Sequence, residues 1–216
     1  ELMILGICGN IGAGKSSLTS LLEETLGFRG VYEAVDENPF LKDFYSNMER
    51  WAFHSQLFFL IKRFDFLKRV VTEGAVILQD RTIYEDVEIF ARNLQLMGYI
   101  DERDWQLYMD TYQTLSEHLT APDGIVYLKC SKNVLLKRIR KRGRGFESGV
   151  SEDYIERLNG LYSEWINSVT FCRKLVIDGD RYDFIESPQD REDVLHLISR
   201  FTAELVAGVQ SRLFSR

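Results

Sequence analysis

Apolar residues along the chain gather in five short continuous runs, and the segments between these runs carry apolar residues at three- and four-residue spacing. Continuous runs of this length are typical of strands covered on both faces, whereas the wider spacing is typical of helices. The expected strands cover residues 2–8, 31–35, 76–79, 125–129 and 175–177. The expected helices cover residues 16–26, 51–71, 84–96, 102–119, 133–140, 152–169 and 190–214. Because strands and helices alternate, the pattern predicts an α/β fold with a mostly parallel sheet.

The chain carries no linker, low-complexity tract or internal repeat between these elements, and it has only three prolines. Hydrophobic residues make up 45% and charged residues 28% of its 216 residues, which is ordinary for a globular protein. We therefore expect a single domain over residues 1–216.

Charge and cysteine content disfavour several classes of protein. The 27 lysines and arginines are outnumbered by 33 aspartates and glutamates, and the net charge of −6 disfavours general nucleic-acid binding. No stretch approaches the roughly 20 apolar residues of a membrane span, and the first residues form a strand-like run without a basic leader. Cys8, Cys130 and Cys172 lie far apart and form no CxxC pair. We expect a cytoplasmic protein without disulfides and without nucleic-acid or membrane partners.

A phosphate-binding loop follows the first expected strand. Residues 9–16 match the pattern G-x-x-x-x-G-K-[ST] at every fixed position. Its small residues let backbone N–H groups surround phosphate oxygens, and the start of the next helix adds the positive end of its dipole. Lys15 brings a charge to the outer phosphates, and the Ser16 hydroxyl can bind Mg²⁺. The predicted phosphate-binding residues are Gly9, Asn10, Ile11, Gly12, Ala13, Gly14, Lys15, Ser16 and Ser17.

A glutamate lies in the second expected strand. Glu33 falls within the apolar run 31–35, where a charge is costly unless it faces a polar site. Such a carboxylate could accept a proton from a substrate hydroxyl, or it could be an ordinary glutamate at a strand edge. Asp36 and Glu37 compete for the same role, but their turn-like setting beside Pro39 favours solvated or capping positions.

An acid and an arginine directly follow the third expected strand. Asp80 could face the phosphate loop and hold Mg²⁺, either directly or through water. Arg81 could hold the hydroxyl being phosphorylated or the charge that develops on the transferring group. The alternative is an ion pair at the surface, beside the start of a helix.

A basic stretch runs from residue 131 to residue 145 and contains seven cations and no acid. We expect a mobile lid over about residues 138–149, in which Arg138, Arg142 and Arg144 contact the phosphates of ATP. Gly143, Gly145 and Gly149 would supply its hinges. The alternatives are a solvated helix face and a nucleic-acid patch, and the acidic remainder of the chain disfavours the latter.

Together these features resemble the deoxynucleoside kinase family, close to its bacterial deoxyadenosine/deoxyguanosine kinase branch. The likeness covers nearly the whole chain. Its markers beyond the phosphate loop are residues 32–35, 51–56 and 80–86 and the lid residues Arg138, Arg142, Gly143, Arg144 and Glu147. The resemblance implies a P-loop kinase fold with a five-stranded parallel sheet in the order 2-3-1-4-5, flanked by helices, with a short basic lid. It also implies a homodimer formed through helices.

The resemblance further implies the roles of the reacting groups. Glu33 would take the proton of the 5′-hydroxyl, and Arg81 would steady that hydroxyl and the transferring phosphoryl group. Lys15 would be the third catalytic residue. Asp80, with Ser16, would hold the Mg²⁺ that accompanies ATP.

It implies an acceptor pocket as well. Gln56 matches the amide that reads the edge of the base, and Asp86 matches the acid that faces Arg63, seven residues after Gln56. Tyr45 and Glu147 match the residues that hold the sugar 3′-hydroxyl, although by themselves they fit a packing tyrosine and a surface acid. The implied substrate-binding residues are Glu33, Tyr45, Gln56, Arg63, Arg81, Asp86, Phe90 and Glu147.

Two aromatic residues, Trp51 and Phe53, would line the base slot with Phe90, although helix periodicity alone fits a core role for both. The chain departs from the family pattern at Ala34, where many members have proline. It also departs at Thr82, where serine is commoner, and at Asp80, where animal members have glutamate.

We expect the transfer of the γ-phosphoryl group of ATP to the 5′-hydroxyl of a 2′-deoxynucleoside, with deoxyadenosine or deoxyguanosine as the favoured acceptor. One alternative is a nucleoside monophosphate kinase such as a thymidylate kinase. It is disfavoured because residues 32–56 contain two cations against five acids, which suits an uncharged acceptor. The other alternative is a nucleotide-binding sensor without turnover.

Overall fold

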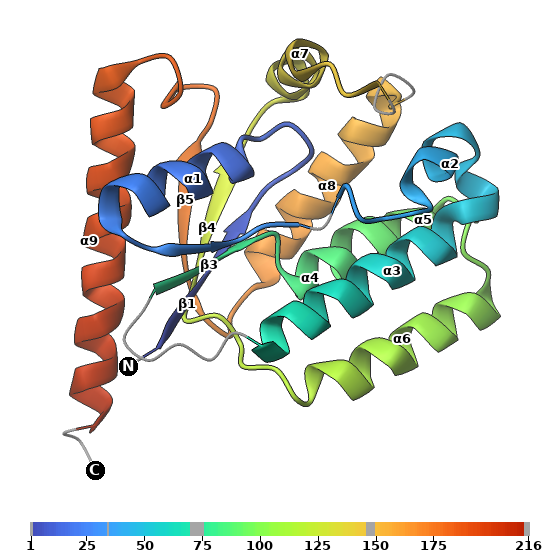
Figure 1. The fold of residues 1–216 in the computed structure, drawn as a ribbon, viewed down its shortest axis with the longest axis horizontal. Coiled ribbons are helices and arrows are strands. Elements are labelled where there is room, and N and C mark those ends of the chain that lie inside the picture. Colours follow the sequence, from blue (N-terminus) through green and yellow to red (C-terminus); the bar gives the residue numbers. More distant parts are fainter. Residues whose placement is uncertain (1, 34, 70–75, 146–149, 214–216) are drawn as a thin grey trace.

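The central feature of the molecule is a parallel sheet whose strands follow the order β2-β3-β1-β4-β5 (Figure 1). The computed structural model describes residues 2–33, 35–69, 76–145 and 150–213. The strands are β1 (Met3–Cys8), β2 (Arg29–Val31), β3 (Val76–Asp80), β4 (Gly124–Lys129) and β5 (Arg173–Asp178). The predicted fold class and strand order are confirmed.

Strand β1 lies in the middle of the sheet, and all of its residues are buried. This position accounts for its continuous apolar pattern, since a central strand is covered on both faces. It pairs with β3 on one side and β4 on the other. In this register Ile7 lies beside Asp80. The phosphate loop after β1 therefore leaves the sheet next to Asp80 and Arg81, at the edge where ligands gather in such folds.

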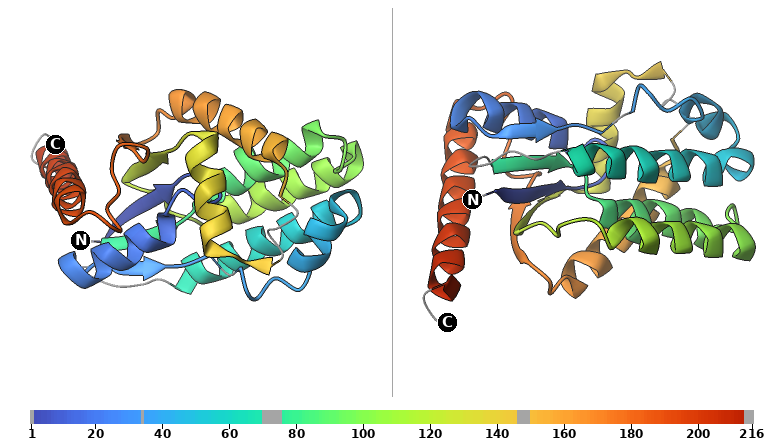
Figure 2. Two further views of the ribbon diagram at one scale, coloured as in Figure 1. Left: turned by 90° about the horizontal axis from the view of Figure 1, so that it is seen from above. Right: turned by 60° about the horizontal axis from the view of Figure 1, so that its bottom comes forward.

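The helices are α1 (Lys15–Leu26), α2 (Leu41–Ser46), α3 (Met48–Arg69), α4 (Ile83–Glu85), η1 (Asp86–Ala91), α5 (Arg92–Leu96), α6 (Glu102–Ser116), α7 (Lys132–Arg142), α8 (Glu152–Ser168) and α9 (Pro188–Leu213). Helix α1 packs on β1, β2 and β3, whereas α9 runs along β5. Helices α3, α5, α6 and α8 form a second group beside the sheet (Figure 2). The hydrophobic core lies between the sheet and the helices that pack on it.

Two expected elements differ from the structure. The single helix expected over residues 84–96 is divided by the π-helical segment η1, whose wider turn is a frequent feature of functional sites. The strand expected over residues 31–35 is wrong, because β2 ends at Val31. Among the described strands, β2 lies at the edge of the sheet and pairs with β3 alone. The N–H of Val35 donates to the carbonyl of Glu33. Glu33 therefore lies just beyond the strand, and helix α2 is an addition that the sequence pattern did not predict.

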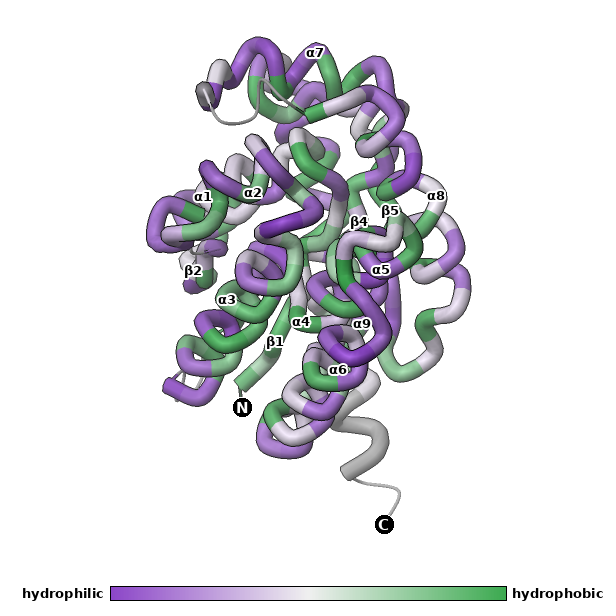
Figure 3. Tube along the Cα trace, turned by 90° about the vertical axis from the view of Figure 1, so that its right-hand side faces the viewer, coloured by the Kyte–Doolittle hydropathy of each residue, from purple (hydrophilic) through white to green (hydrophobic). Residues whose placement is uncertain are grey.

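Hydropathy follows this arrangement. Figure 3 shows β1 as hydrophobic and α7 as largely hydrophilic. Among the described helices, none is both long and apolar enough to cross a membrane.

Candidate functional site

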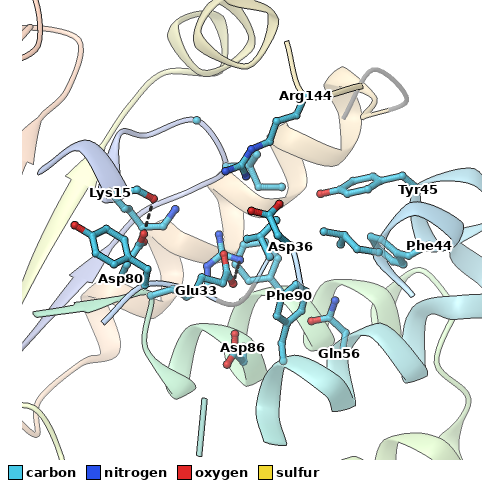
Figure 4. Close-up of a pocket in the computed structure, with 18 of the residues that line it drawn as sticks. Lys15, Glu33, Asp36, Phe44, Tyr45, Gln56, Asp80, Asp86, Phe90 and Arg144 are labelled. Carbon is cyan, nitrogen blue, oxygen red and sulfur yellow. Dashed lines mark hydrogen bonds and ion pairs between the residues drawn. The ribbon is translucent and has the colours of Figure 1, made fainter. Parts of the chain in front are cut away.

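A cavity of about 270 Å³ opens at the carboxyl ends of β1 and β3. Its walls come from the phosphate loop, the loop after β2, helices α2 and α3, the end of β3 with the turn after it, η1, the end of α7 with the residues after it, and α8. Figure 4 shows Lys15 and Asp80 on one side of this cavity, Phe44 and Tyr45 on the other, and Glu33 between them. Segments far apart in the sequence thus face one space.

The phosphate loop owes its shape to three glycines with positive φ. The φ angles of Gly9, Gly12 and Gly14 are 152°, 82° and 97°, and glycine reaches this region without steric cost. A Cβ at Gly12 would lie 3.0 Å from the carbonyl oxygen of Leu135 in α7, so the loop also needs a small residue there. Helix α1 begins directly afterwards, at Lys15.

Lys15 is buried, and its Nζ donates to the carbonyl of Asn10 at 3.1 Å. Burial and the neighbouring Arg81 lower the pKa of Lys15. The side chain of Asn10 ties the loop to α8, because its Nδ2 donates to Ile155 O at 3.1 Å and to Asn159 Oδ1 at 2.7 Å.

Asp80 and Ser16 meet beside the loop. The Ser16 hydroxyl donates to Asp80 Oδ2 at 2.5 Å, whereas Asp80 Oδ1 is buried without a hydrogen-bond partner among the described residues. Burial raises the pKa of Asp80. A carboxylate oxygen left without a donor and a hydroxyl beside it fit Mg²⁺, which prefers oxygen ligands. No group of three or more His, Cys, Asp or Glu side chains in the described part of the chain could hold a metal ion, so other ligands would have to complete the coordination.

Glu33 lies between two arginines. Its Oε1 accepts from Arg81 Nη1 at 2.9 Å and from Arg63 Nη2 at 3.2 Å. Burial raises the pKa of Glu33, but the positive charges of Arg81, Arg63 and Lys15 outweigh it and lower that pKa overall. Glu33 is therefore ionised at neutral pH and faces the cavity.

Arg81 is held in a backbone conformation that favours glycine. Its φ is 72°, and among the described residues it alone combines a side chain with a positive φ. The Arg81 N–H donates to Ile7 O at 3.0 Å, and the guanidinium carbon lies 3.8 Å from the centre of the Phe90 ring. Such strain persists where the surroundings enforce it, and it often marks functional sites. Its buried Nε has no partner among the described residues.

Arg63 and Asp86 are brought together as expected, with Arg63 Nε 2.5 Å from Asp86 Oδ2. Arg63 Nη1 also donates to the carbonyls of Arg81 at 2.7 Å and Asp80 at 3.3 Å. Its Nη2 donates to Asp86 Oδ1 and Glu33 Oε1, both at 3.2 Å. These contacts match the five N–H groups of a guanidinium. Arg63 does not line the described cavity, whereas Asp86 does.

The far side of the cavity is aromatic. Tyr45, Gln56 and Phe90 line it as expected. Trp51 and Phe53 are not among its described lining residues, and the expectation that they line the slot is wrong. Trp51 stacks on Phe40, with ring centroids 5.7 Å apart, and Phe53 packs against His54.

Phe44 and Phe59 line the cavity instead. Phe59 lies three residues after Gln56 and four before Arg63, so the helix period could have identified it. Phe44 comes from α2, the helix that was not predicted. Asp36 also lines the cavity, whereas Glu37 is exposed and pairs with Lys62 at 2.9 Å.

The basic stretch divides into two parts. Arg142 and Arg144 line the cavity. Arg138 does not line the described cavity; it lies behind the phosphate loop, where it donates to Gly179 O at 2.9 Å and Ala13 O at 3.3 Å. Three other cations form exposed ion pairs with acids outside the stretch, namely Lys132 with Glu156, Arg140 with Glu152 and Lys141 with Glu186. Glu147 and Gly149 fall outside the described residues.

Comparison with known proteins identifies similar chains. A family model described as deoxynucleoside kinase matches residues 5–203. A deoxyguanosine kinase of Lactobacillus acidophilus is 38% identical over 208 residues, which cover 90% of this chain and 89% of that protein. A deoxyadenosine/deoxycytidine kinase of Bacillus subtilis is 34% identical and covers 91% of each chain. The structure of deoxyadenosine kinase from M. mycoides with bound dATP has a TM-score of 0.79 and 29% sequence identity, and it covers 91% of this chain and 99% of that chain.

Proposed function

This chain belongs to the deoxynucleoside kinase family, and from that premise we propose that it transfers the γ-phosphoryl group of ATP to the 5′-hydroxyl of deoxyadenosine or deoxyguanosine. One observation carries this proposal: the phosphate loop, the Glu33–Arg81 pair and the aromatic wall with Gln56 all line one cavity. A triphosphate on the loop and a nucleoside against the wall would then meet at Glu33.

Glu33 accepts the proton of the 5′-hydroxyl as that oxygen bonds to the γ-phosphorus of ATP and the bond from the γ-phosphorus to the β–γ bridging oxygen breaks, which releases ADP. It is ionised because the nearby arginines lower its pKa. Phosphoryl transfer depends mainly on positioning and charge stabilisation, so a weakly basic carboxylate suffices. The unpartnered Nε of Arg81 is a donor free to bind the hydroxyl or an oxygen of the phosphoryl group.

The phosphates are held by backbone N–H groups of the phosphate loop and the start of α1, other than that of Gly9, which donates to Glu85. Lys15, Arg142 and Arg144, which also line the cavity, add positive charge. Arg138 stands behind the loop and supports its backbone instead of contacting the phosphates. Bound Mg²⁺ would neutralise part of the phosphate charge, and Asp80 and Ser16 are the residues that would hold it.

The acceptor base lies between Phe90 and the apolar side chains of α2 and α3, with the Gln56 amide at its edge. An amide donates and accepts side by side, which suits the edge of a purine. Tyr45 holds the sugar from α2. Glu147, outside the described residues, stays a predicted partner of the 3′-hydroxyl.

A phosphorylation screen with ATP and Mg²⁺ tests the proposal. It compares the four deoxynucleosides, adenosine and thymidine monophosphate. We expect turnover of deoxyadenosine or deoxyguanosine well above that of the other acceptors. Preferred turnover of thymidine monophosphate would identify a nucleoside monophosphate kinase, and ATP binding without turnover of any acceptor would identify a sensor.

We further propose that the chain forms a homodimer in the cytoplasm and that residues 138–149 act as a lid on a single domain. The exposed apolar side chains of Leu96 and Leu107 support an interface between helices, and the three free cysteines suit a reducing compartment. Sedimentation at several protein concentrations tests the dimer.

A further inference from the structure

Glu85 is a fully buried carboxylate at the end of α4, and it accepts hydrogen bonds with both oxygens. Its Oε2 accepts from the backbone N–H of Thr82 at 2.7 Å and from the Thr82 hydroxyl at 3.1 Å. Its Oε1 accepts from the backbone N–H of Gly9 at 3.1 Å and from the Tyr162 hydroxyl at 2.8 Å. Glu85 forms no ion pair with a described residue.

These contacts join the two halves of the site. Gly9 is the first residue of the phosphate loop, and Thr82 directly follows Arg81 in the strained turn after β3. The hydroxyl of Tyr162, from α8, also lies 2.8 Å from the carbonyl oxygen of Gly9, so it reinforces the same junction. One rigid side chain therefore spans from the loop that would hold the donor to the turn that would hold the acceptor hydroxyl.

Helix capping explains only half of this arrangement. Glu85 and Thr82 form a capping box at the start of α4, and a capping box needs one carboxylate oxygen for the backbone N–H of the N-cap residue. The other oxygen is used for Gly9 and Tyr162, which are remote in sequence. Burying a carboxylate without a paired cation is costly, so a function of the second oxygen is expected.

We propose that Glu85 is a positioning residue that holds the phosphate loop and the Arg81 turn at a fixed separation, so that the donor phosphate and the acceptor hydroxyl lie in line. This role rests on the proposed function. It matters because catalysis here consists largely of positioning, and a displacement of about 1 Å costs on the order of 10²-fold in rate.

The test compares Glu85→Asp, which keeps the charge but cannot span both partners, with Glu85→Gln, which places an N–H₂ group against donors. Glu88→Gln is the matched control, since Glu88 lies three residues after Glu85, in η1, and its side chain is exposed. We measure kcat, the Kd of ATP, the Kd of deoxyadenosine, and the Kd of an analogue that joins deoxyadenosine to adenosine through a 5′,5′-oligophosphate. This analogue binds tightly only if both halves of the site are in register.

We expect kcat of both Glu85 variants to fall about 10- to 100-fold, with the Kd of each single ligand changed by less than about threefold. The Kd of the joined analogue should rise about tenfold or more. An unchanged kcat in the folded variants, or equal weakening of all three ligands, would overturn the positioning role.

Tyr162→Phe provides a second measurement if the Glu85 variants do not fold, because it removes only the hydroxyl at this junction. It should lower kcat and weaken the joined analogue while leaving the single ligands unchanged, and behaviour like the parent protein would overturn the proposal. If the unmodified chain phosphorylates no deoxynucleoside, the proposed function fails. An active parent with unaffected variants contradicts only the role of Glu85.

Discussion

Arg63 Nη2 lies 3.2 Å from Glu33 Oε1, so an arginine that we expect among the substrate-binding residues also contacts the carboxylate beside the expected phosphoryl-transfer position. The same guanidinium binds Asp86 and the carbonyls of Asp80 and Arg81. Both side chains are nearly buried, with side-chain exposures of 6% and 11%. Arg63 thereby links Asp86, which lines the cavity, to Glu33.

Arg63→Lys should lower kcat about tenfold or more, because a single ammonium cannot supply the five donors that hold Glu33 and the Arg81 turn. It should also loosen base choice toward thymidine. The measurement is kcat and KM for deoxyadenosine and thymidine. Arg69→Lys, at an exposed position of the same helix, is the control. A change in base choice at constant kcat would mean that Arg63 acts on the base alone.

Glu33→Gln should reduce kcat by about 10²-fold or more while both substrates still bind, because the amide keeps the shape but cannot accept the proton. Single-turnover kinetics and equilibrium binding separate these effects. Glu37→Gln, in the exposed ion pair with Lys62, should behave like the parent. Undiminished single-turnover rates would show that Glu33 is not the base, and Asp36, which also lines the cavity, would be tested next.

The pH dependence of kcat should reflect the lowered pKa of Glu33. The base is active when ionised, and its ionised form is lost only as the pH falls through a pKa below the ordinary value of 4.5. The acid limb of kcat should therefore lie below about 4.5. Replacing the buried pair by Arg63→Gln with Asp86→Asn removes one of the two positive charges that contact Glu33 and should move that limb to higher pH. Circular dichroism over the same pH range checks that the fold persists. An acid limb of kcat that stays at the same pH in this variant would contradict the assignment of Glu33 as the base.

Asp80→Asn should raise the free Mg²⁺ concentration needed for half-maximal activity, because Asp80 Oδ1 is the unpartnered oxygen beside Ser16. Titrating Mg²⁺ at constant ATP measures this shift. Asp110→Asn, on the exposed face of α6, is the control. An identical Mg²⁺ dependence in both variants would assign the cation to other ligands.

What the sequence alone determined is local. Three local patterns predict structure: the continuous apolar run of β1, the glycine pattern of residues 9–14, and the acid and arginine at the end of β3. They do so because burial and backbone conformation restrict the residue types at those positions. The parallel α/β class followed from these elements, and the family resemblance supplied the strand order.

Only the tertiary structure decided which side chains meet. A periodic pattern places Phe53, Gln56 and Phe59 on a helix but does not show which other segment each side chain contacts. In the structure Phe59 lines the described cavity, whereas Phe53 does not. Arg138 and Arg142 share a helix face, yet only Arg142 reaches the cavity. Glu85 meets Gly9 across 76 residues of chain because β1 and β3 are neighbours in the sheet. Hydrogen-bond partners so distant in sequence leave no periodic signal, and packing alone determines them.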